Sequence, residues 1–159
     1  MKLDQAGIDF IKSFEGFSPV VYKDIRGKFT IGWGHTENVC ESTPPVTKEE
    51  AEMLLRSDLD ATETLLGKIL KFKITQWEYN ALCSLVFNIG IGNFLNSTLL
   101  KRLNAHDMVG ASKEFDRWVY YRDPRTGERA ISPGLEKRRL LEKELFLAVI
   151  NLKRSQTVG

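Results

Sequence analysis

Three polar residues near the start of the chain have the types and the spacing that cleavage of a glycosidic bond requires. Glu15, Asp24 and Thr30 lie in the segment EGFSPVVYKDIRGKFT, with eight residues between the carboxylates and five between Asp24 and Thr30. The reaction needs a carboxylic acid that protonates the departing oxygen, and a second group that directs water or stabilises positive charge on the sugar ring. This spacing allows the chain to end a helix, cross a strand, turn at Arg26 and Gly27, and return, so the three side chains can converge.

Carboxylates are common on protein surfaces, so a simple surface role is the alternative interpretation. The local context favours a site. Glu15 follows an apolar helical run, Asp24 begins a turn, and Thr30 lies in the β-type run 29–31. We therefore interpret this segment as one wall of a cleft.

The elements that position these residues begin with a helix capped by Asp4, which carries apolar residues at helical spacing as far as Phe14. Rough alternation of apolar and polar residues from Val20 to about Ile31, around a glycine-containing turn, predicts a hairpin. Residues 36–46 are expected to form a loop.

Thr47 and Glu50 form a capping box that opens a helix of about 24 residues, or about 36 Å, which is long enough to link two lobes. Asp58 falls on the apolar side of this helix, where a carboxylate is costly unless it is paired. His35 leaves the predicted hairpin nearby, so we predict a structural ion pair between His35 and Asp58.

A second capping box, Thr75 with Glu78, opens an apolar helix that ends near Gly90 and should form the hydrophobic centre. Aromatic residues at helical spacing are more often core than sugar-binding. We therefore assign three of them in this run to packing: Trp77, Tyr79 and Phe87.

Helices are also expected after Ser97 and around residues 108–118, followed by a polar, turn-rich loop over 120–132. Ser132 and Pro133 have N-cap and N1 chemistry, and they should start one last helix whose apolar positions extend to Leu152.

A chain of 159 residues with 42% hydrophobic content is enough for one domain with a real core. The predicted fold is α+β, with a small antiparallel β lobe and a larger helical lobe joined by a long helix. We expect a single domain over 1–159: a β lobe over about 15–46, a linking helix over about 47–70, and a helical lobe over about 71–159 together with the N-terminal helix.

No apolar run approaches the eighteen or so residues that span a bilayer, and the N-terminus lacks the apolar block of a secretory signal. The two cysteines are too few for a disulfide scaffold, and Cys83 lies in an apolar helical stretch that favours a buried thiol. We expect a soluble chain, suited to a reducing compartment.

The ordered segments resemble the phage lysozyme (endolysin) family that includes the lysozymes of phages T4 and P22. That family has a Glu, eight residues, an Asp or Cys, five residues and a Thr, followed by a glycine-rich segment ending in Gly-His; here the last part reads IGWGH. QWEYNALCSLVFNIGIGNFLNSTLL and PGLEKRR resemble the family's two later signatures. The resemblance implies a lysozyme-like fold and hydrolysis of the β-1,4 bond between N-acetylmuramic acid and N-acetylglucosamine in bacterial peptidoglycan, for host lysis.

In this interpretation Glu15 is the general acid, which must stay protonated and therefore needs partial burial or a negative neighbour. Asp24 stays ionised and, with Thr30, orients water, as the family implies, which inverts the anomeric centre. Direct attack by Asp24 with retention is the alternative, and the sequence spacing leaves both open. Carboxyl groups roughly 6.5 to 9.5 Å apart favour inversion, whereas about 5 to 5.5 Å favours retention.

Arg138 and Arg139 match the paired arginines of the family's C-terminal signature. One of them is a candidate to fix a catalytic carboxylate in the cleft. Pairing with Glu136 or Glu142, both expected on the surface, is the alternative.

The charge is uneven, since residues 1–100 carry 10 basic and 13 acidic groups and residues 101–159 carry 13 basic and 8 acidic groups. A basic C-terminal part would be attracted to the anionic polymers and peptide carboxylates of bacterial walls. Nucleic acid is a weaker candidate, because no nucleic-acid-binding motif accompanies the charge. We expect peptidoglycan as the partner, no nucleic acid, no stable membrane association and a monomer. By the resemblance, the enzyme stays in the host cytoplasm until a separate pore releases it to the wall.

Two other functions compete with this interpretation, and neither cofactor nor metal is expected. A zinc amidase or a Cys-His amidase would have to be built from the four residues His35, His106, Cys40 and Cys83, which show no metal-binding spacing. A non-catalytic wall-binding module would not need Glu15, Asp24 and Thr30, and their presence argues against it.

Overall fold

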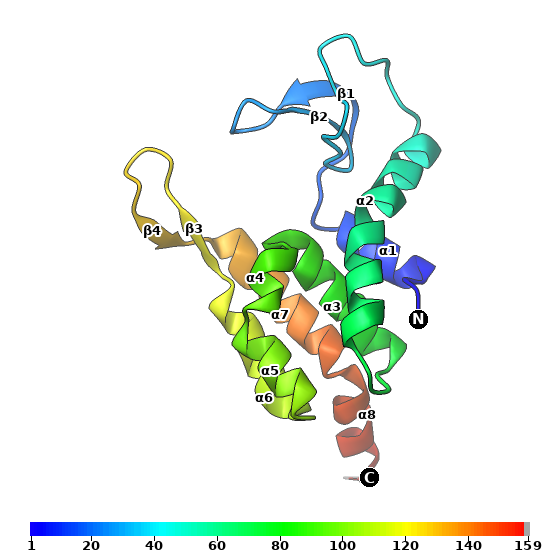
Figure 1. The fold of residues 1–159 in the computed structure, drawn as a ribbon, viewed down its shortest axis with the longest axis vertical. Coiled ribbons are helices and arrows are strands. Elements are labelled where there is room, and N and C mark those ends of the chain that lie inside the picture. Colours follow the sequence, from blue (N-terminus) through cyan, green and yellow to red (C-terminus); the bar gives the residue numbers. More distant parts are fainter. Residues whose placement is uncertain (158–159) are drawn as a thin grey trace.

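A small β lobe and a larger helical lobe lie at opposite ends of one long helix in the computed structural model, which describes residues 1–157 and, for Asn151 and Arg154, the backbone only (Figure 1). This confirms the predicted α+β fold class. The first part of the chain comprises α1 (Gln5–Lys12), β1 (Ser18–Lys23), β2 (Phe29–Gly32) and the long helix α2 (Lys48–Ile69). The helical lobe adds α3 (Gln76–Ile89), α4 (Ile91–Leu95), α5 (Thr98–Asn104), α6 (Met108–Glu114), the 3-10 turn η1 (Phe115–Arg117), β3 (Tyr120–Arg122), β4 (Arg129–Ile131), α7 (Pro133–Phe146) and α8 (Ala148–Thr157).

Helix α1 begins as predicted, because the Asp4 side chain accepts a hydrogen bond from the Gly7 N–H group. A β-carbon at Gly7 would lie 2.6 Å from Asn80 Oδ1, so the absence of a side chain lets α1 approach α3 closely. Strands β1 and β2 pair antiparallel, with Tyr22 opposite Thr30, and confirm the predicted hairpin. The opening helix therefore packs on the helical lobe, while the chain that follows it builds the β lobe.

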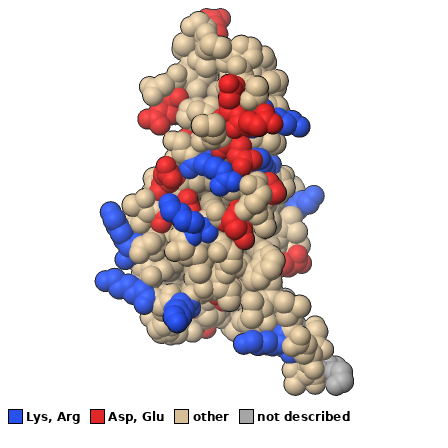
Figure 2. Space-filling view, turned by 90° about the vertical axis from the view of Figure 1, so that its right-hand side faces the viewer, with Lys and Arg blue, Asp and Glu red and all other residues tan. Residues whose placement is uncertain are grey.

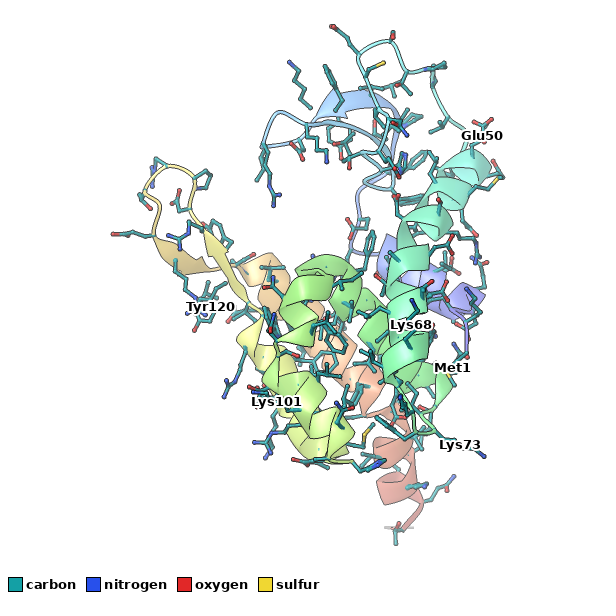
Figure 3. All side chains as sticks on the ribbon, in the orientation of Figure 1. Met1, Glu50, Lys68, Lys73, Lys101 and Tyr120 are labelled. Carbon is teal, nitrogen blue, oxygen red and sulfur yellow. The ribbon has the colours of Figure 1, made fainter. Side chains whose placement is uncertain are left out.

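Helix α2 runs from the β lobe to the helical lobe, with Glu50 near one end and Lys68 near the other (Figure 3). Both halves of the capping box at Thr47 are present, and the 22 residues of the helix span about 33 Å. Its apolar stripe is buried at Leu55, Leu59 and Leu66. The predicted linking helix is confirmed almost to its boundaries.

The hydrophobic core is centred on α3, whose capping box at Thr75 is also present. Tyr79 is buried, as expected, and Phe87 packs against the core. The assignment of Trp77 to packing is wrong, since its side chain is 45% exposed. Trp77 is the second residue of α3, where a side chain can face away from the neighbouring helices.

Two predictions for the C-terminal part are wrong. The expected loop over 120–132 contains a second antiparallel hairpin, β3 with β4, which lies outside the predicted β lobe. Its turn is closed by bonds from Gly127 N to Asp123 O and from Arg125 N to Asp123 Oδ1. The expected single last helix is interrupted at Leu147, where α7 ends before α8 begins. The apolar periodicity of the sequence continues through this break, so the sequence gives no signal for it.

The face seen in Figure 2 shows acidic side chains mainly toward the β-lobe end and Lys and Arg mainly toward the other end. No helix within residues 1–157 combines the length and the apolar character needed to cross a membrane.

Candidate active site

Glu15 lies at the junction between the two lobes, just beyond the end of α1. Its N–H group bonds to Ile11 O, at 3.3 Å, which extends the helical turn and fixes the backbone. The side chain is 25% exposed, and Arg138 Nη1 donates to Oε1 at 3.0 Å. The other oxygen faces Gly34, where a β-carbon would lie 3.6 Å from Oε2. The carboxyl group is therefore partly buried, and its charged neighbour is positive rather than negative.

Arg138 is buried and holds Glu15 against the helical lobe. Its Nε donates to Glu142 Oε1 at 3.0 Å, and its Nη2 lies 3.2 Å from Ser84 O. The guanidinium also lies over the Phe14 ring, 4.7 Å from its centroid. Since a planar guanidinium has five N–H donors in a fixed arrangement, these contacts determine where it can hold the Glu15 carboxyl group.

Arg139 pairs with Glu142, which is the alternative that the sequence left open, and does not contact Glu15. Its Nη1 donates to Glu142 Oε2 at 2.6 Å, its Nε to Trp118 O at 2.8 Å, and its Nη2 to Asn88 Oδ1. Burial lowers the pKa of Arg139, while the Glu142 carboxylate acts in the opposite direction. The expectation that Glu142 lies on the surface is wrong, because its side chain is fully buried between the two arginines and Ser84.

Asp24 opens the turn between β1 and β2. Two backbone N–H groups donate to its Oδ1, those of Arg26 at 2.8 Å and Lys28 at 2.9 Å. Among residues 1–157 its side-chain hydrogen bonds all end at this oxygen, which leaves Oδ2 for water or substrate. The turn therefore fixes the carboxylate, and no charged side chain in the described part of the chain pairs with it.

Thr30 is joined to Asp24 through the backbone of Lys28. The Lys28 carbonyl accepts a bond from Thr30 Oγ1 at 3.0 Å and one from Asp24 N at 2.9 Å, while the Lys28 N–H group donates to Asp24. Thr30 is only 3% exposed, and its hydroxyl oxygen keeps lone pairs that can accept from water. The hairpin thus places Asp24 and Thr30 as one unit, while Glu15 reaches the same lobe at Gly34.

A cavity of about 900 Å³ is lined from both lobes, and Glu15, Asp24 and Thr30 are not among the residues that line it. Ile25 and Arg26 come from the β1–β2 turn next to Asp24, while Leu135 and Arg139 flank the position of Arg138 on α7. Figure 1 shows the two hairpins projecting from different lobes on the same side of the molecule. The site therefore lies beside a space large enough for an extended ligand.

His35 and Asp58 form the pair that the sequence predicts. His35 Nδ1 lies 2.9 Å from Asp58 Oδ1 and 3.0 Å from Oδ2, and both side chains are largely buried. His35 follows β2 and Asp58 lies on α2, so the contact fastens the β lobe to the linking helix.

Replacing Asp58 with asparagine should lower the free energy of unfolding by about 1 to 3 kcal/mol, because a charge-assisted hydrogen bond between partly buried groups is lost. Urea unfolding with an unchanged m-value would measure it. Asp60→Asn, at an exposed position on the same helix, is the control. Equal stability of the two variants would contradict a structural role for the pair.

The two thiols differ in their surroundings. Hydrogen bonds with Ser42 and Thr43 lower the pKa of the exposed Cys40, whereas burial raises the pKa of Cys83. A Cys-His nucleophile would need a histidine beside the thiol. His35 Nδ1 is already occupied by Asp58. Within the described residues no three His, Cys, Asp or Glu side chains gather in a way that could hold a metal ion.

The chain is similar to known proteins in both sequence and structure. The family model described as Phage lysozyme matches residues 12–142. The chain is 43% identical over 146 residues to an endolysin of Acyrthosiphon pisum secondary endosymbiont phage 1, covering 92% of this chain and 98% of that protein. It is 38% identical to an endolysin of Bacillus phage B103, covering 92% of this chain but 54% of that protein, so it spans about half the length of this relative.

Among solved structures, the muramidase domain of SpmX from Asticaccaulis excentricus superposes with a TM-score of 0.84 at 36% identity, covering 92% of this chain and 97% of that one. The matched residues 12–142 include Glu15, Asp24 and Thr30 as well as Arg138 and its partner Glu142. The chain belongs to the phage lysozyme family.

Proposed function

We propose that Glu15, Asp24 and Thr30 are the catalytic residues of this endolysin muramidase, which hydrolyses the β-1,4 bond between N-acetylmuramic acid and N-acetylglucosamine in peptidoglycan and so lyses the host cell. The observation that carries the proposal is the Lys28 backbone link. It joins the Asp24 carboxylate to the Thr30 hydroxyl, and Ile25 and Arg26 of the same turn line a cavity that both lobes form.

Glu15 is the proton donor in this proposal. Arg138 orients one carboxyl oxygen, which leaves Oε2, on the side of Gly34, to deliver the proton to the departing glycosidic oxygen. Partial burial of the side chain keeps bulk water from competing for that proton. As the bond breaks, positive charge develops on the sugar ring, and a nearby ionised Asp24 would stabilise it.

Asp24 and Thr30 direct the water. The Thr30 hydroxyl donates its hydrogen bond to Lys28 O, so its oxygen can accept a hydrogen bond from the attacking water. Asp24 Oδ2 takes the proton that this water loses as it attacks the sugar. Because neither group then bonds to the sugar, the product leaves with inverted anomeric configuration.

The partner in this proposal is bacterial peptidoglycan. The enzyme binds it as a monomer, without nucleic acid and without a stable association with the membrane. We also propose that the enzyme accumulates in the host cytoplasm and reaches the wall through a separate pore. We further propose that the β lobe, the linking helix and the helical lobe act together as one domain, and a cavity lined from both lobes supports this.

Product analysis tests the function. Digestion of purified cell wall by the wild type should release N-acetylmuramic acid reducing ends, and proton NMR recorded at once should show the anomer opposite to the bond cleaved. Activity should persist in excess chelator and after alkylation of the exposed Cys40. Release of peptides without new reducing sugar ends would identify an amidase instead.

A further inference from the structure

The hairpin formed by β3 and β4 lines the cavity with arginine. Figure 3 shows Tyr120 at the base of this hairpin, where it leaves the helical lobe. Among the described residues no Asp or Glu lines the cavity, but five arginines do: Arg26, Arg117, Arg122, Arg129 and Arg139. A wall with this composition has a strongly positive potential and attracts anions.

Two of the five arginines are already neutralised. Arg139 pairs with Glu142, and Arg117 Nε lies 2.8 Å from Glu114 Oε2. Within residues 1–157 no carboxylate pairs with the other three, which are Arg26, Arg122 and Arg129. Three uncompensated charges therefore remain around one cavity.

Arg122 and Arg129 are also placed directly opposite each other in the register of the hairpin. Residues opposed in an antiparallel pair share a face, and like charges there repel. A hairpin chosen for stability alone would place opposite charges at these positions, so the arrangement suggests a function that needs both arginines.

Each of these two arginines is held in place by a neutral group. Arg129 stacks on the Tyr120 ring, with its guanidinium carbon 3.8 Å from the centroid, and Arg122 Nη1 donates to Gly127 O at 2.7 Å. Both guanidinium groups retain free N–H donors. A carboxylate between them would accept paired hydrogen bonds and relieve the repulsion.

We propose that Arg122 and Arg129, with Arg26 across the cavity, form a subsite for a carboxylate of the peptide carried by the glycan strand. The proposal rests on the function above, since the strand must enter the cleft beside Asp24. The peptide is the substituent of that strand that offers carboxylates. Tyr120 and Tyr121 line the same cavity and provide apolar surface for the rest of the ligand.

The test compares two substrates: purified peptidoglycan freed of phosphodiester polymers, and the same material after enzymatic removal of its peptides. Arg122→Gln and Arg129→Gln should each lower kcat/KM on the peptide-bearing wall by about tenfold, as expected for loss of a charge-assisted hydrogen bond. The loss on the peptide-free glycan should be several times smaller. Arg125→Gln is the matched control, because it removes the same charge from the same hairpin at a side chain that is 87% exposed and does not line the cavity.

Equal losses on the two substrates would overturn the subsite, as would an equal loss for Arg125→Gln, which would indicate general attraction to the wall. A loss that occurs only on walls still bearing phosphodiester polymers would assign the arginines to those polymers instead. Calorimetric binding of a soluble disaccharide-peptide to the Glu15→Gln protein, with and without Arg129→Gln, measures the subsite independently of turnover. If the wild type releases no reducing ends from either substrate, the proposed function fails first, and the two failures are thereby distinguished.

Discussion

Replacing Glu15 with glutamine is expected to lower the rate of reducing-end release from purified cell wall by about 10²- to 10⁴-fold, the contribution of a positioned general acid. Glutamine has the same shape and retains an oxygen that can accept from Arg138, but it has no proton to give to the leaving group. The measurement is the initial rate at saturating wall concentration, together with circular dichroism and thermal unfolding to show that the fold is intact.

Glu136→Gln is the matched control for this experiment, because it removes a carboxylate from an exposed position on α7, the helix that carries Arg138. It should retain wild-type activity. A folded Glu15→Gln protein that lyses walls as fast as the wild type would remove Glu15 from the mechanism. A variant that fails to fold would instead indicate that the Arg138 contact is chiefly structural.

The largest effect on stability is expected at Glu142. Its carboxylate is fully buried and accepts from Arg138, Arg139 and Ser84. Glu142→Gln therefore leaves the buried Arg139 without a counterion and leaves Arg138 with Glu15 as its remaining carboxylate partner. Breaking a buried ion pair from one side costs about 3 to 5 kcal/mol. Urea unfolding with an unchanged m-value should show this loss, and activity should also fall, because Arg138 no longer holds Glu15 in one place.

Glu144→Gln, two residues along the same helix and exposed, should change the free energy of unfolding by no more than about 0.5 kcal/mol. If Glu142→Gln is as stable as this control, the buried cluster is not a stabilising element. If it is unstable yet fully active when folded, Glu15 does not depend on Arg138 for its position.

The parts of the fold that the sequence predicts well are those set by local chemistry. The capping boxes at Thr47 and Thr75 satisfy helix N–H groups within four residues, and Ser132 with Pro133 starts α7 in the same way. The pairing of His35 with Asp58 could also be predicted, because one carboxylate on an apolar helix face requires a partner.

What the sequence does not predict depends on contacts between distant segments. Arg138 contacts Glu15 across 123 positions, and it is the packing of both α1 and α7 against α3 that brings this arginine of α7 to Glu15. The second hairpin is polar and short, so its strands lack the apolar alternation that marks a half-buried strand. The sequence carries one signal for this hairpin, which is the turn-forming segment Asp-Pro-Arg-Thr-Gly between Tyr-Tyr-Arg and the later Arg-Ala-Ile.

The connection between Asp24 and Thr30 runs entirely through main-chain atoms of Lys28. The side chain at position 28 is exposed, so substitutions there can change it and still keep the hydrogen bonds that join Asp24 and Thr30. Proline alone is incompatible, for it has no amide hydrogen to give. Substitutions at position 28 can therefore change the charge and polarity of the turn that carries Asp24, to suit different bacterial walls, while the chemistry is kept.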